Sequence, residues 1–184
     1  MSKEGLQLAA RFAWSAKACS DNQEGKKILE NCVVENKYDG VETILSGYKE
    51  MMFYLSILAR EMQKEIFSKE VVSPYWLGGD ELNRFSGDIL PFHLFKVLRE
   101  PGNPDDCMVR WGPVTEIGKS KLIAVLYSTG QKSKELLVYP KGFLPGLKNG
   151  DIIAAHGGIA VKILTPEEET SLDYWTKKAL RRKN

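Results

Sequence analysis

The pattern of apolar and polar positions divides the chain into a helical first half and a strand-rich second half. Apolar residues recur at three- and four-residue steps over 5–18, 22–34 and 40–67, which predicts three amphipathic helices. The longest, 40–67, is expected to run for about seven turns as the central helix of a bundle. Ser73-Pro74 is expected to end the helical pattern, because the residue before a proline disfavours helical backbone angles.

Two apolar segments follow this proline. Residues 75–82 contain an aromatic pair and two glycines, which predicts a turn that leads into a short helix. Residues 89–98 are almost continuously apolar. Periodicity does not decide whether they form a strand or a buried helical turn.

The second half begins after Pro-Gly-Asn-Pro-Asp-Asp at 101–106, which we interpret as a linker between domains 1–100 and 107–184. Five short β-type segments then predict a small closed or nearly closed barrel: 107–117, 120–128, 134–140, 151–156 and 158–164. Thr165 and Glu168 form a capping box that starts a terminal helix, with Pro166 at its first position. The expected fold class is α+β, with an all-α module followed by the barrel and its helix.

The composition of the chain argues against a nucleic-acid-binding protein and a membrane protein. The 184 residues are 43% hydrophobic and 27% charged, and their net charge of +2 argues against a basic nucleic-acid binder. The expected barrel strands also lack the basic and aromatic interleaving of single-strand binders. The apolar runs are too short for a membrane helix, and the N-terminus has no signal-peptide pattern. Three cysteines without an export signal favour reduced thiols in the cytoplasm.

Cys107 and His156 are the first candidates for chemistry, since a thiol and an imidazole are common transition-metal ligands. Cys107 could instead be a small buried hydrophobe, and His156 a hydrogen-bonded histidine at a strand end. His93, between Phe92 and Phe95, is either a core histidine or a third ligand that the helical module brings over the barrel. Hydrolase motifs are absent from the sequence, so an enzyme is not the leading interpretation.

Two motifs resemble the HypC/HupF family of hydrogenase maturation chaperones. The first family motif is Cys-x-x-x-Pro-Gly-x-Val, and here Cys107, Gly112 and Val114 match it while Trp111 replaces the proline. The second reads Gly-Asp, two apolar residues, and then a histidine followed by Gly-apolar-Ala. It is matched in order by Gly150, Asp151, Ile152, Ile153, His156, Gly158, Ile159 and Ala160. The family cysteine is N-terminal, whereas Cys107 is internal.

This resemblance implies an OB-like barrel with a C-terminal helix and a function in metallocentre assembly. In the family, the cysteine and the histidine carry an iron centre with cyanide and carbon monoxide to a hydrogenase subunit. Carried over to this chain, the resemblance makes Cys107 and His156 candidate iron ligands. His93 is a third candidate because of its position in the helical module and not because of the resemblance. The expected partner is a maturation factor or a metalloenzyme subunit. The alternative is a protein-interaction adaptor that keeps the barrel without the metal.

The first half is also similar to a known sequence type. The segments Ala10-Arg11-Phe12-Ala13 and Tyr75-Trp76-Leu77-Gly78 resemble the helical part of an uncharacterised prokaryotic family that carries a HypC-like tail. That family has no assigned activity. The similarity therefore predicts a helical module followed by a HypC-like module, but it does not predict a function.

Overall fold

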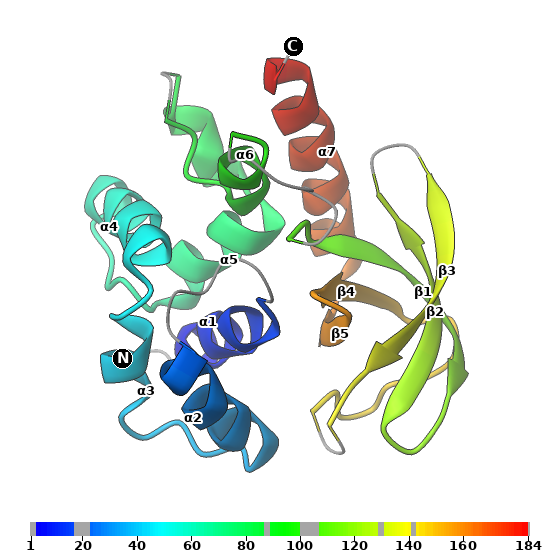
Figure 1. Ribbon diagram of the computed structural model, residues 1–184. Helices are drawn as coiled ribbons and strands as arrows, with labels where there is room; N and C mark the ends of the chain where they lie inside the picture. Colours follow the sequence, from blue (N-terminus) through cyan, green and yellow to red (C-terminus); the bar gives the residue numbers. More distant parts are fainter. Residues whose placement is uncertain are drawn as a thin grey trace.

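Helices form the first half of the chain, and a barrel with one long helix forms the second half (Figure 1). The computed structural model describes residues 3–16, 23–86, 89–99, 107–128, 131–140 and 143–183. The helical part contains α1 (Lys3–Ser15), α2 (Gln23–Val34), α3 (Val41–Leu45), α4 (Lys49–Met62), α5 (Lys69–Leu77), the 3-10 helix η1 (Asp80–Arg84) and α6 (His93–Val97). The helices expected over 5–18 and 22–34 are therefore confirmed as α1 and α2, with small shifts at their ends.

The single long helix expected over 40–67 is wrong. The chain forms α3 and α4, separated by a turn at residues 46–48. Gly47 lies in this turn, and glycine is a poor helix former. The apolar repeat nevertheless continues across the turn, because both helices place their apolar residues in the same core: Val41, Leu45, Leu55 and Leu58 are all fully buried. Periodicity alone therefore could not reveal the interruption.

The expected helix end at Ser73-Pro74 is also wrong, because α5 continues through Pro74 to Leu77. Proline has no backbone N–H, so the bond to the carbonyl four residues earlier is lost. The helix persists because its side chains are packed in the core: Val71, Val72, Tyr75, Trp76 and Leu77 are buried. Within 75–82, the expected turn lies at Gly78-Gly79 and the expected short helix is η1. Residues 75–77 belong to α5. The ambiguous segment 89–98 contains a helical turn, α6.

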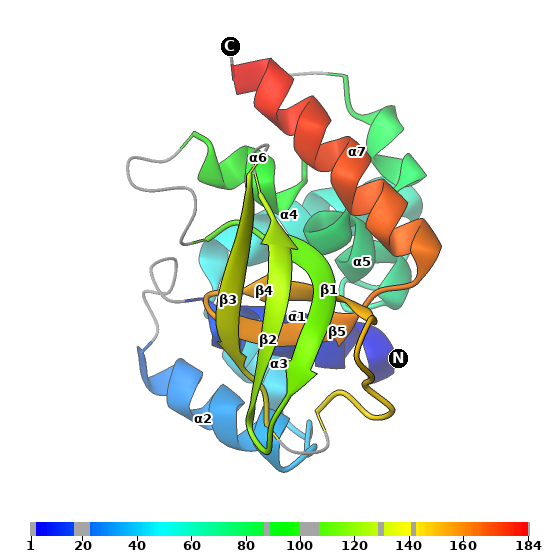
Figure 2. The ribbon, with the colours of Figure 1, turned by 90° about the vertical axis from the view of Figure 1, so that its right-hand side faces the viewer.

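The five predicted strands are confirmed, with bounds that differ by a few residues. They are β1 (Arg110–Ile117), β2 (Lys121–Tyr127), β3 (Lys132–Val138), β4 (Ile152–His156) and β5 (Ile159–Ile163). They close into a barrel in the order β1-β2-β3-β5-β4. All neighbours are antiparallel except β3 and β5, which are parallel and paired at Val138 and Ile159. Figure 2 shows β1, β2 and β3 in front, with β4 and β5 between them and the helices.

The terminal helix α7 (Pro166–Lys183) begins as the sequence predicts. The Glu168 backbone N–H donates to the Thr165 hydroxyl at 3.2 Å, and the Thr165 N–H donates to the Glu168 carboxylate at 3.1 Å. This reciprocal pair is the capping box. Leu172, Trp175 and Ala179 form its buried apolar stripe. No helix in the described ranges is both long and apolar enough to cross a membrane.

The helical part and the barrel pack against each other. Helix α1 contacts β5, while α5 and α6 contact α7, which lies between the two halves in Figure 1. One continuous cluster of buried side chains includes residues of both halves. The expected linker 101–106 lies outside the described residues, so the division into domains 1–100 and 107–184 stays a prediction of chain organisation.

Gly78 is where α5 meets α7, and Gly78→Ala is expected to cost about 2 kcal/mol of unfolding free energy. Its φ is +79°, and an added Cβ would lie 2.5 Å from the Trp175 ring. Both the backbone strain and the overlap disfavour alanine. Urea unfolding measures the loss. Gly40→Ala is the control for a positive φ without an overlap: φ is +76° there, ψ is 0° against 169° at Gly78, and nothing lies within 4 Å. Equal losses for both variants would contradict a role for the Trp175 contact.

Candidate functional site

Cys107 lies just before β1 and is almost completely buried, with 5% of its surface exposed. Its backbone carbonyl accepts two hydrogen bonds from imidazoles. His93 Nε2 lies 2.9 Å from this oxygen, and His156 Nε2 lies 3.0 Å from it. We refer to Cys107, His93 and His156 as the Cys107 cluster. The three residues that the sequence singled out as candidate ligands therefore lie together.

The two histidines reach Cys107 from different halves of the fold. His93 begins α6 in the helical part, and His156 ends β4 of the barrel. Their ring centroids are 5.3 Å apart, with the planes nearly perpendicular at 77°. The cluster consequently connects α6, β4 and the start of β1. This is the arrangement expected if the helical module brings His93 over the barrel.

The second nitrogen of each imidazole also has a partner. His156 Nδ1 lies 2.7 Å from the Ser15 hydroxyl, and His93 Nδ1 lies 3.3 Å from the Tyr75 hydroxyl. Each Nε2 must carry the proton that it donates to the Cys107 carbonyl. In a neutral ring Nδ1 is then an acceptor, and the Tyr75 hydroxyl can donate to His93 Nδ1. The Ser15 hydroxyl donates to the Phe12 carbonyl at 2.8 Å, so its single proton is shared between this carbonyl and His156 Nδ1.

Aromatic rings surround the cluster. Trp76 stacks on Phe12 with ring centroids 4.5 Å apart and an interplanar angle of 7°. The Trp76 ring also lies 4.3 Å from His93 and 5.6 Å from His156. Tyr75 packs against His93, and Trp76 packs against both imidazoles. His93 is 2% exposed and His156 is 1% exposed, so water has little access to either ring.

Burial keeps both histidines neutral at pH 7. It lowers the pKa of His156 to about 4, although the carbonyls of Cys107 and Phe12 favour the charged ring. Burial also lowers the pKa of His93 well below its usual value, and the nearby His156 and Lys96 add to this effect. Neutral imidazole is the form that binds metals. In the geometry described, however, all four ring nitrogens contact other protein groups.

The metal assignment of Cys107, His156 and His93 stays a prediction. The structure brings these residues together, but the imidazoles contact the Cys107 backbone oxygen. Within the described parts of the chain, no group of three or more His, Cys, Asp or Glu side chains is placed to bind a metal ion. Of the other cysteines, Cys32 is half-buried on α2 and Cys19 lies outside the described residues.

Several motif residues have a structural role. A Cβ on Gly112 would lie 1.9 Å from the Val125 carbonyl oxygen, so only glycine allows β1 and β2 to approach there. The Asp151 carboxylate accepts from the Lys148 N–H at 2.7 Å and closes a turn before β4. Gly157 and Gly158 have φ values of 57° and 83° and form the two-residue turn of the β4–β5 hairpin. These positions shape the barrel. Cys107 and His156 are then the motif residues whose side chains are suited to bind a metal.

Sequence reasoning missed Ser15 as a member of this site. It is the last residue of α1 and only 1% exposed, and no motif marks it. A serine at a helix C-terminus is common, and only the tertiary packing of α1 against the barrel shows its histidine partner. Tyr75 is a second partner that no motif marks. Its hydroxyl contact with His93 could not be inferred from spacing.

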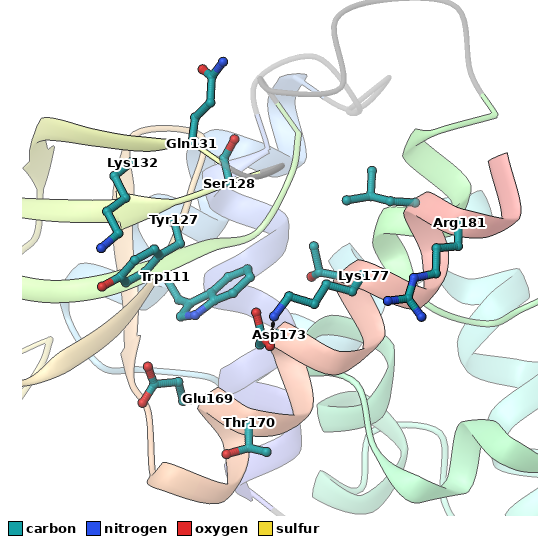
Figure 3. A pocket seen from close by; sticks show the side chains of 12 residues that line it. Trp111, Tyr127, Ser128, Gln131, Lys132, Glu169, Thr170, Asp173, Lys177 and Arg181 are labelled. Carbon is teal, nitrogen blue, oxygen red and sulfur yellow. Dashed lines mark hydrogen bonds and ion pairs between the residues drawn. The ribbon is translucent and has the colours of Figure 1, made fainter. Parts of the chain in front are cut away.

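A groove of about 650 Å³ separates the barrel from α7 (Figure 3). Trp111 and Tyr127 form the barrel wall, and Trp111 points toward α7. The α7 wall carries two acids followed by two bases at four-residue steps: Glu169, Asp173, Lys177 and Arg181. Lys177 Nζ lies 2.6 Å from Asp173. Trp111, the residue that replaces the motif proline, therefore contributes to a surface groove as well as to the barrel core.

Comparisons with known proteins assign no family to this chain. No family model matches the chain, and neither the curated proteins nor the solved structures contain a match.

Proposed function

We propose that this chain handles an iron fragment for a partner metalloenzyme, in the manner of HypC-type chaperones. The observation that carries the proposal is the convergence of Cys107, His93 and His156. His93 and His156 are the only histidines of the chain, and both contact the cysteine that the resemblance selects. An OB-like barrel is part of the proposal. The strand order β1-β2-β3-β5-β4 with its parallel β3–β5 pair supports it.

The donor set suits iron. A thiolate and neutral imidazoles are ligands for soft or borderline transition metals. An imidazole that binds the iron fragment must release the Cys107 carbonyl, and a buried acceptor left without a donor costs about 1–3 kcal/mol. Structural zinc sites with four Cys and His ligands contribute roughly 10 kcal/mol or more, which is about 2.5 kcal/mol per ligand. Metal binding must therefore compete with hydrogen bonds that fix the backbone of Cys107 in the described geometry.

Anaerobic purification of the full chain tests this proposal. The wild-type protein is expected to contain bound iron and to show infrared bands of cyanide and carbon monoxide. Cys107→Ala is expected to lose both. This variant keeps the backbone carbonyl, so the two histidine hydrogen bonds remain and the fold is retained. Cys32→Ala is the matched control, because Cys32 is the other described free cysteine.

Two results would contradict the proposal: iron and both bands retained in Cys107→Ala, or neither iron nor bands in the wild type. The second result favours the alternative of a protein-interaction adaptor without metal. The groove between the barrel and α7 is the observation that supports this alternative, because it is large enough for part of a partner chain. In either case the partner is a protein.

A further inference from the structure

A cavity of about 50 Å³ lies beside the Cys107 cluster, between α1, α4, α5 and α6. Residues from each of these helices line it: Ala13, Glu50, Trp76, His93 and Lys96. A water molecule needs about 10–15 Å³ measured in this way, so the cavity accommodates about three or four waters or an anion of similar size. Its lining combines aromatic side chains, such as Tyr75 and Trp76, with the charged side chains of Glu50 and Lys96.

Lys96 brings a buried positive charge to this cavity. Its side chain is 7% exposed, and its ammonium contacts the Glu50 carboxylate, whose side chain is 61% exposed. A buried cation is stable only with a negative or strongly polar partner. Glu50 itself has no such need, because its carboxylate is well solvated when it moves away from Lys96. The buried member of the pair therefore depends on an anion more than the exposed member depends on a cation.

The Glu50–Lys96 pair lies at the boundary between the cavity and a second hollow. This hollow has a volume of about 280 Å³ and is lined by Lys49, Glu50, Phe53, Tyr54 and Lys96. The cavity and the hollow share Lys49, Glu50 and Lys96. Movement of the exposed Glu50 side chain would thus connect them. A small solute could then reach Lys96 from the hollow without any change in the helices.

We propose that Lys96 anchors a small oxyanion of carboxylate type, of the size of formate or bicarbonate, which enters the cavity by displacing the Glu50 carboxylate. Glu50 occupies the position of this anion in the structure, and the exchange keeps the charge of Lys96 compensated. The cavity volume limits the ligand to a few non-hydrogen atoms. The site shares His93 with the Cys107 cluster, but its anchor is Lys96 and not Cys107.

Isothermal titration of the full chain with sodium formate tests the proposal. Glu50→Gln removes the competing carboxylate and keeps the shape, so formate is expected to bind at least about tenfold more tightly than to the wild type. Lys96→Met is expected to abolish binding. Asp173→Asn is the matched control, because it removes the acid of an exposed Lys–Asp pair and should leave formate affinity unchanged.

Nuclear magnetic resonance locates the probe. Formate should shift the Trp76 indole signal and the His93 ring signals, and it should leave the Trp111 indole unchanged, because Trp111 lines the distant groove. Equal affinities of the wild type and Glu50→Gln would overturn the proposal, as would formate binding to folded Lys96→Met. If Lys96→Met does not fold, the Glu50→Gln comparison and the Trp76 shift decide alone, and the absence of either result overturns the proposal.

Discussion

Gly112→Ala is expected to unfold the protein or to reduce its unfolding free energy by more than about 4 kcal/mol. The added Cβ would lie 1.9 Å from the Val125 carbonyl oxygen and 2.9 Å from its carbonyl carbon. Both are backbone atoms, so no rotamer change relieves the overlap. Strands β1 and β2 must separate, and the barrel loses part of its closure. Urea unfolding monitored by circular dichroism measures the loss.

Glu116→Ala is the matched control for this substitution. Glu116 lies on the same strand and is exposed, so its replacement is expected to change stability by less than about 0.5 kcal/mol. A stable, fully folded Gly112→Ala protein would show that the strands can move apart at little cost. The glycine of the cysteine motif would then need a functional explanation in place of a structural one.

The sequence predicts the barrel better than the helical part. The β1–β2 connection contains Gly118 and the β4–β5 hairpin contains Gly157-Gly158, and such signals are local. The terminal helix is marked equally well, because the Thr165–Glu168 capping box needs only neighbouring residues. Local signals of this kind act within a few residues, so one sequence suffices to recognise them.

The helical boundaries depend on tertiary packing, and the sequence predicts them poorly. The turn around Gly47 is hidden because α3 and α4 bury their apolar residues in one core. Pro74 stays in α5 because the buried side chains around it outweigh one missing hydrogen bond. In both cases a long-range effect overrides a local preference. A local pattern cannot show which of the two prevails.

The sequence predicts which residues form the candidate site, but it does not predict how their atoms contact one another. The sequence selects Cys107, His156 and His93 because thiols and imidazoles are the side chains suited to metal chemistry. It cannot show that the imidazoles contact the Cys107 carbonyl, because a backbone atom has no sequence signature. The partners Ser15 and Tyr75 are equally invisible, since each lies far along the chain from its histidine.

Stability is expected to fall by about 3 kcal/mol between pH 7.5 and pH 4 through His156 alone. The pKa of His156 drops from 6.5 in the unfolded chain to about 4 in the folded protein. Between these values the unfolded state binds the proton and the folded state does not, so acid favours unfolding. The loss begins near pH 6.5 and is complete below about pH 4, where both states are protonated. The lowered pKa of His93 acts in the same direction.

The His156→Gln variant isolates this contribution. Glutamine retains an N–H group that can donate to the Cys107 carbonyl, but it does not titrate, so the variant should be less sensitive to acid than the wild type. Urea unfolding at several pH values from 7.5 to 4 gives the two slopes, and carboxylate effects cancel in their difference. Identical slopes would mean that the His156 ring is protonated as readily in the folded protein as in the unfolded chain. The interpretation of His156 as a buried neutral donor to Cys107 would then be wrong, and with it the account of how the helical part and the barrel are joined at this cluster.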